Sequence, residues 1–418
     1  MNKQELENQL KLKIDEFLPI LKRNNNVENV RESFFCSQSD KTIVKIMTYS
    51  ERETFNSPIK LLLNEKGIAE KYSEEFIDKK LVEYYHKLLA DELKIEQYVK
   101  ELIDFLLSNG LKDYFVISEV ENIRILDDQK YDIIDSTIKI LKEEDLPFKK
   151  EQFTLFGTET FNPINKPVIF TRIKAGESEK AKEMALHNFL VSFNLIKLYA
   201  TNFKPVLKGC LLSGNQELVV YNETDKSMSA NLSKVGDLLL NHAYLNNDLY
   251  NQLKNAGIEE LSKPTRISQV VKECLYWFGL GLDEKYPSAR LINFVTVLES
   301  TLKKKDETTE LRRTVSERGA ILLYDKFEQR KEAFKQLREI YDTRSKVVHT
   351  GVLIDNKDLA SLAGGYARVV LINLIKKAKE FNGNFDDFIM SIDDFKLGKQ
   401  DKDEKPTTKE HKGVEVEA

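Results

Sequence analysis

The hydrophobic pattern of the chain changes character at about residue 264. Before this point, short segments rich in β-branched and aromatic residues alternate with helical patterns. After it, the apolar residues recur only at helical spacing, over long stretches. Strands mixed with helices, followed by helices alone, favour two domains of different class. A length of 418 residues is enough for two or three domains with cores of their own.

The N-terminal part predicts an α+β domain over residues 1–255. Helices are expected at 6–21, at 73–107 (as two helices), at 132–142 and at 178–199. Strands are expected at 41–47, 114–117, 123–126, 153–156, 168–173 and 218–221. The polar run at 23–26 is expected to end the first helix, and residues 118–122 are expected to join two of the strands.

The C-terminal part predicts an all-α helical bundle over residues 256–397. Its five helices are expected at 264–282, 287–304, 308–324, 326–350 and 355–381. The aromatic run Tyr276-Trp277-Phe278 is expected in the bundle core, and the acidic pairs Asp386-Asp387 and Asp393-Asp394 are expected to be solvated. Residues 398–418 lack apolar periodicity and predict a disordered tail.

Composition limits the chemistry that the chain can carry. The net charge is −4, and Cys36, Cys210 and Cys274 are odd in number and far apart. This excludes a disulfide framework and a zinc site built on cysteine, so neither a metal nor a cofactor is expected. The polar N-terminus and apolar runs well below about 20 residues indicate a cytoplasmic protein without a membrane partner.

The end of the fourth predicted bundle helix carries the one arrangement with a chemical interpretation. Arg344 and His349 are five residues apart, about 140° around a helix and about 7.5 Å along it. Ser345 and His349 share a helix face. An imidazole can exchange protons near neutral pH, and a guanidinium can stabilise an anionic phosphorane. Together they suit acid–base cleavage of RNA, in which the 2′-hydroxyl attacks the phosphate and leaves a 2′,3′-cyclic phosphate.

Three stretches of the C-terminal part together resemble one family, the HEPN superfamily, and within it the ApeA-like branch. They are the helix from Arg266-Ile267-Ser268-Gln269-Val270 to Leu275-Tyr276-Trp277-Phe278-Gly279-Leu280-Gly281-Leu282, the helix Arg290-Leu291-Ile292-Asn293-Phe294-Val295-Thr296-Val297-Leu298-Glu299-Ser300, and the motif Tyr341-Asp342-Thr343-Arg344-Ser345-Lys346-Val347-Val348-His349. The resemblance covers a little over a quarter of the chain.

The resemblance implies a HEPN-like helical bundle that dimerises, with two Arg/His pairs facing each other. It implies a metal-independent endoribonuclease acting as a toxin or an antiviral defence or stress effector. It makes Arg344 and His349 the catalytic pair, places Ser345 in the polar slot of the motif, and gives Glu299 the role of orienting Arg344. Two features depart from the family pattern: Ser345 stands where Asn, Asp or His is common, and Thr350 follows the histidine where glycine is frequent.

Local charge is compatible with an RNA partner. Residues 301–350 carry 13 Lys and Arg against nine Asp and Glu, a net of +4 within a chain that is otherwise −8. Arg312, Arg313, Arg338 and Lys346 are the candidate RNA-binding residues. The alternative interpretation is a set of solvated helix faces crossed by ion pairs.

Two other function classes remain open. One is a non-catalytic HEPN module that binds RNA or oligomerises within a sensor or scaffold. The other is a small-ligand sensor in which an N-terminal pocket controls the bundle. In the nuclease hypothesis, the N-terminal domain senses a trigger or restrains the enzyme, so the candidate partners are RNA, a second copy, a regulatory ligand, a phage trigger and an antitoxin.

Overall fold

The computed structural model describes residues 1–25, 35–39, 42–46, 48–89, 94–126, 129–148, 163–200, 206–207, 218–231, 243–351, 353 and 355–398. The chain divides into two compact units. Unit 1 comprises Met1–Phe193 and Asn202–Asn247, and unit 2 comprises Asn194–Thr201 and Asp248–Ala418. The predicted strand at 153–156, Cys210, His242, and the predicted tail beyond Gly398 with His411 lie outside the described residues.

Unit 1 begins with helices packed around one apolar core. The helices are α1 (Lys3–Asn25), α2 (Tyr49–Leu63), α3 (Lys66–Ala69), α4 (Glu74–Leu89) and α5 (Ile95–Ser108), with the hairpin β1 (Phe35–Ser39) and β2 (Thr42–Ile46). Leu10, Ile14 and Phe17 follow one face of α1 and are fully buried. α1 ends at Asn25, within the polar run that was expected to end it, and its last turn is held by Asn24 Nδ2, which donates to Glu51 Oε2 on α2 at 2.9 Å.

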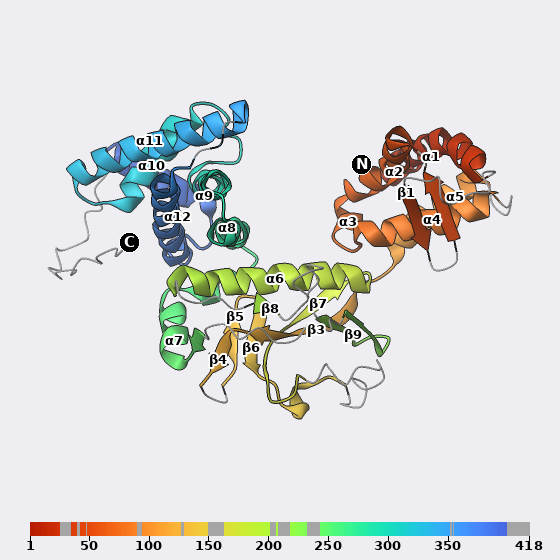
Figure 1. Cartoon of the computed structure of the whole chain (residues 1–418), viewed down its shortest axis with the longest axis horizontal. Coiled ribbons are helices and arrows are strands. Elements are labelled where there is room, and N and C mark those ends of the chain that lie inside the picture. The colour runs from red at the N-terminus through yellow and green to blue at the C-terminus, as the bar shows by residue number, and fades with distance from the viewer. Residues whose placement is uncertain are drawn as a thin grey trace. The chain divides into compact units, whose positions relative to one another are not determined.

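The second part of unit 1 is an antiparallel sheet (Figure 1). Its strands are β3 (Lys112–Glu121), β5 (Tyr131–Ile133), β6 (Ser136–Ile140), β7 (Pro167–Ala175), β9 (Leu218–Asn222) and β10 (Ser227–Asn231), in the order β10-β9-β3-β7-β6-β5. The short β8 (Val206–Leu207) pairs with the far end of β3, and β4 (Ile123–Ile125) pairs in parallel with β11 (Ala243–Leu245). A 3₁₀ turn, η2 (Glu143–Asp145), follows β6.

Two predictions in this region are wrong. The helix expected at 132–142 is the hairpin of β5 and β6, because burial alternates along both strands with the period of two that belongs to a strand. The connection expected at 118–122 is mostly strand, since β3 continues to Glu121 and only Asn122, at φ 61°, separates it from β4. The remaining N-terminal helices and strands that fall on described residues are confirmed within a few residues of their expected ends.

The helix α6 (Ser178–Tyr199) belongs to both units. Its residues up to Phe193 lie in unit 1, where the Ser192 hydroxyl donates to the carbonyl of Ile133 at 2.9 Å. Its last turns lie in unit 2, where Lys197 Nζ is 2.9 Å from an Asp283 oxygen and the Arg368 side chain donates to the Leu198 carbonyl at 2.7 Å. The amphipathic pattern of 178–199 is therefore confirmed as one continuous helix.

Unit 2 is helical throughout its described part. It contains α7 (Asn247–Asn255), η4 (Ile258–Ser262), α8 (Arg266–Asp283), α9 (Pro287–Leu302), α10 (Leu311–Leu323), α11 (Phe327–Thr350), α12 (Lys357–Lys377) and α13 (Phe385–Lys396). The five predicted bundle helices correspond to α8–α12, and α12 packs on α8, α9 and α10 (Figure 1). By length and composition alone, α12 could cross a membrane, but more than half of its apolar window is buried in the unit, as in a core helix.

Two expectations for the bundle are corrected. Phe278 is buried, whereas Trp277 is 38 % exposed, because consecutive helix residues point about 100° apart and cannot all face one core. The acidic stretch after residue 384 is the helix α13, which buries Phe385, Phe388 and Ile389. Asp386 and Asp387 are exposed on it as expected, whereas Asp393 is half-buried and pairs with Arg318 on α10. The two acidic pairs had masked the apolar spacing of this helix.

Neighbouring glycines of α12 give a matched test of packing. A Cβ at Gly364 would lie 2.8 Å from the Phe294 ring, whereas a Cβ at Gly365 would meet nothing within 4 Å. We expect Gly365→Ala to stabilise the unit by about 0.5–1 kcal/mol through helix propensity. Gly364→Ala is expected to be about 1–3 kcal/mol less stable than that variant, because Phe294 must shift. The test is urea unfolding followed by Trp277, the only tryptophan of the chain; equal midpoints for the two variants would refute the close packing.

Candidate functional site

The candidate catalytic residues lie in the last two turns of α11. The helix stops at Gly351, which adopts φ 68° and donates its N–H to the Val347 carbonyl at 3.1 Å. His349 is therefore held in the final turn, where it is exposed and forms no hydrogen bond or ion pair with the described residues. Ser345 lies one turn earlier on the same face and is half-buried. This end of the helix leaves the imidazole open to a ligand.

The packing of α9 against α11 brings Arg344 to Glu299. Arg344 Nη2 lies 3.6 Å from Glu299 Oε2, and the two side chains are 23 % and 18 % exposed. This separation is an ion pair without a hydrogen bond. The Nε–H of Arg344 is buried without an acceptor, and within the described residues the guanidinium donates no hydrogen bond. Arg344 is thus oriented by a charge while its donors remain available.

Tyr341 is a further member of the cluster, one turn before Arg344. Burial, followed by the interaction of its hydroxyl with Glu299, raises the pKa of Tyr341 to about 12. The phenol therefore stays protonated at neutral pH, with its hydroxyl close enough to the Glu299 carboxylate to interact with it. Glu299 on α9 is held by two groups of α11. Tyr341 stands in the motif that resembles the HEPN signature, but its sequence position gave no indication that it would reach Glu299.

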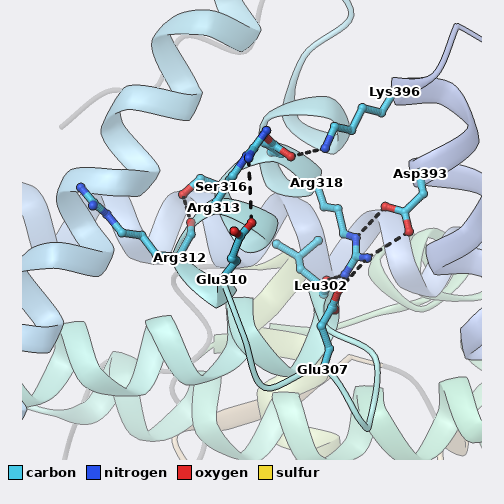
Figure 2. A network of polar contacts seen from close by, with 10 residues as sticks. Leu302, Glu307, Glu310, Arg312, Arg313, Ser316, Arg318, Asp393 and Lys396 are labelled. Atoms are coloured by element: carbon cyan, nitrogen blue, oxygen red, sulfur yellow. Dashed lines mark hydrogen bonds and ion pairs between the residues drawn. The ribbon is translucent and has the colours of Figure 1, made fainter.

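Arg318, on α10, shows what a fully satisfied arginine looks like in the same unit (Figure 2). It is 5 % exposed, and it donates to both oxygens of Glu307, to both oxygens of Asp393 and to the Leu302 carbonyl, at 2.6–3.1 Å. These five bonds use all five N–H donors of a guanidinium. Arg318 therefore joins α10 to α13 and to the segment after α9. It was counted in the basic segment, but it has no donor left for a phosphate.

The acids around Arg318 predict a loss of bundle stability at low pH. Partial burial raises the pKa of Glu307 and Asp393, but the hydrogen bonds from Arg318 and the other favourable contacts outweigh it, so each pKa is lowered. Their contribution to stability is present above the unfolded pKa of about 4 and is lost as the pH falls through the lower folded value. The urea midpoint reported by Trp277 should fall between pH 6 and pH 3, and less steeply in Asp393→Asn. A parallel loss in both proteins would contradict this assignment.

The four candidate RNA-binding residues differ in whether an acidic side chain already neutralises their charge. Arg312 forms an ion pair with Asp342 on α11, which places it beside the candidate site. Arg313 is paired with Glu317 at 2.8 Å, within the network that includes Lys396 (Figure 2). Arg338 lies over the ring of Phe334, and Lys346 is exposed; neither has an acidic partner in the described residues. The alternative of ion-paired helix faces thus applies to Arg312 and Arg313.

Among the described residues of this unit, the other reactive side chains form no second site. Cys274 is fully buried in α8, and burial raises the pKa of its thiol well above the usual range. Within the described ranges, no three His, Cys, Asp or Glu side chains lie close enough together to hold a metal ion. Comparison of the chain with protein-family models, with curated proteins and with solved structures finds no match.

Proposed function

We propose that unit 2 is a metal-independent endoribonuclease of HEPN type, with Arg344 and His349 as its catalytic residues. The observation that carries the proposal is the contrast between two arginines of one bundle. Arg318 uses all five donors on the protein, whereas Arg344 is oriented by Glu299 and donates none to the described residues. A partly buried, oriented guanidinium with free donors beside an exposed imidazole suits the recognition of a phosphate.

The reaction follows from these two groups. His349 accepts the proton of the ribose 2′-hydroxyl as its oxygen attacks the adjacent phosphorus, and Arg344 stabilises the anionic phosphorane. The bond from phosphorus to the 5′-oxygen breaks, and that oxygen takes up a proton. The products are a 2′,3′-cyclic phosphate and a 5′-hydroxyl. In a homodimer with facing sites, the second copy's His349 supplies the proton to the leaving oxygen.

The supporting residues act on Arg344 and on the substrate. Glu299 and Tyr341 orient the guanidinium, and Ser345 shares the face of His349. Lys346 and Arg338, which lack acidic partners in the described part of the chain, contribute to RNA binding. The biological setting that fits is a cytoplasmic defence or stress effector, with unit 1 as its sensor or restraint.

The direct test incubates the purified full chain with tRNA or total RNA in EDTA, beside Arg344→Ala and His349→Ala prepared in the same way. The proposal expects cleavage by the native sequence and none above background by the variants. Equal cleavage by all three would overturn the assignment. RNA binding without any product would instead establish the non-catalytic alternative.

A milder variant tests the orienting role of Tyr341. Tyr341→Phe removes the hydroxyl that interacts with Glu299 and keeps the ring, so the cleavage rate at saturating RNA should fall about three- to tenfold, the effect of losing one polar interaction. KM should change little, since Tyr341 does not contact RNA in this scheme. Ser300→Ala, next to Glu299, serves as the control. A rate equal to that of the native protein would remove Tyr341 from the cluster.

A further inference from the structure

Unit 1 contains a cavity of about 460 Å³ that the proposed nuclease does not use. It lies between α4 and α5 on one side and strands β3, β9 and β10 on the other. The two walls are tied together: Gly176 donates its N–H to the Lys71 carbonyl at 2.8 Å, and Ser73 donates to Glu177. The volume is in the range of small-ligand sites in proteins.

One wall of this cavity is aromatic. Phe76 and Phe105 have near-parallel rings, with centroids 6.3 Å apart and planes inclined by 16°. Tyr72, which is buried, stacks on Phe76 at 5.0 Å. Tyr72 also lies 6.4 Å from Phe105, so the three near-parallel rings form one compact aromatic cluster. Such a cluster can take a further planar ring by offset stacking.

The charged groups of the cavity are of two kinds. Glu177 is fully used by the protein, since its oxygens accept from Ser73 and from the backbone N–H groups of Glu179 and Lys180, at 2.6–3.0 Å. Lys80 lies 5.7 Å from the centroids of both Phe76 and Phe105, and its ammonium pairs with Glu83 at 2.8 Å. Lys80 therefore brings a positive charge next to the aromatic wall.

The opposite wall carries a second cation and an acceptor. Lys112 Nζ and Asn222 Nδ2 both donate to the same oxygen of Asp225, Oδ2, at 2.6 and 3.0 Å. The other oxygen, Oδ1, accepts nothing from the described residues. Ser227 and Ser229 also line this wall. A ligand here can meet two ammonium groups and one free carboxylate oxygen.

From this juxtaposition we infer that the cavity of unit 1 binds a ribonucleoside monophosphate. The base stacks on Phe76 and Phe105, the phosphate lies with Lys80 and Lys112, and a ribose hydroxyl donates to Asp225 Oδ1. This site is independent of the proposed RNA cleavage and contains none of its residues.

The experiment titrates AMP, GMP, CMP and UMP into the full-length Arg344→Ala/His349→Ala variant by calorimetry, so that the proposed nuclease site does not contribute. At least one monophosphate is expected to bind, with the matching nucleoside and inorganic phosphate each at least tenfold weaker. Lys112→Ala and Phe76→Leu should each weaken binding at least tenfold. Lys174→Ala, which removes an exposed lysine paired with Asp113 on the same sheet, should leave it unchanged. No binding at 1 mM of any monophosphate, or binding insensitive to Lys112→Ala and Phe76→Leu, overturns the inference.

Discussion

Replacing Arg318 by methionine is expected to lower the free energy of unfolding of the bundle by about 3 kcal/mol. The substitution removes the Arg318 donors from two carboxylates and from the Leu302 carbonyl, and leaves Glu307 and Asp393 only their contacts with Lys304. Removing one partner of a buried ion pair costs about 3–5 kcal/mol. The low end applies because Glu307 and Asp393 retain 24 % and 35 % side-chain exposure and can be rehydrated in part. The measurement is urea unfolding followed by Trp277.

The matched control for this variant is Arg313→Met on the same helix. Arg313 is exposed and forms surface ion pairs with Glu317 and Glu310, so little change in the unfolding midpoint is expected. Combining Arg318→Met with Glu307→Gln and Asp393→Asn should recover part of the loss, because no charged acid is then left unpaired. Similar midpoints for Arg318→Met and Arg313→Met would show that the network does not hold α10 and α13 together.

The largest expected effect on activity is that of His349→Ala. Loss of a general acid or base lowers rates by about 10²–10⁴, and Arg344→Ala should cost a similar factor of about 10²–10³. Both are measured as initial rates on a short RNA at saturating concentration. His349→Ala should leave the unfolding midpoint reported by Trp277 nearly unchanged, because His349 is exposed and has no partner among the described residues.

Arg344→Lys separates charge from geometry. Lysine keeps the positive charge but not the planar arrangement of donors, so it should recover little of the activity lost in Arg344→Ala. Recovery to near the native rate would mean that Arg344 acts only as a charge. A His349→Ala rate within threefold of the native rate would remove the histidine from the reaction.

The bundle could be predicted from the sequence because its helices are long and strongly periodic. Each of α8 to α12 was expected within a few residues, and the helix that holds Arg344 and His349 ends at the expected glycine. α13 was missed because its acidic pairs suggested a solvated stretch, whereas Asp393 is paired with Arg318 through tertiary contacts. The hairpin at 131–140 was missed because a short β-branched run has no decisive period.

The candidate site was likewise predictable only where it depends on local sequence, and not where it depends on tertiary packing. Local spacing indicated Arg344, Ser345 and His349, and the resemblance indicated Glu299, which the structure places 3.6 Å from Arg344. The interaction of Tyr341 with Glu299 and the full use of the Arg318 donors depend on how α9, α10, α11 and α13 pack. Charge counting along the chain could not separate arginines that are free from arginines that are paired, since their acidic partners lie up to 75 residues away.

The central claim is tested most directly by the chemistry of the product ends. A short RNA is incubated with the native full chain in EDTA, with His349→Ala as the preparation control, and the fragments are analysed by mass spectrometry. The account predicts a 2′,3′-cyclic phosphate and a 5′-hydroxyl that appear only with the native sequence, and no cleavage at a residue whose ribose lacks the 2′-hydroxyl. A 3′-hydroxyl with a 5′-phosphate, cleavage at the deoxy position, or intact RNA would contradict it.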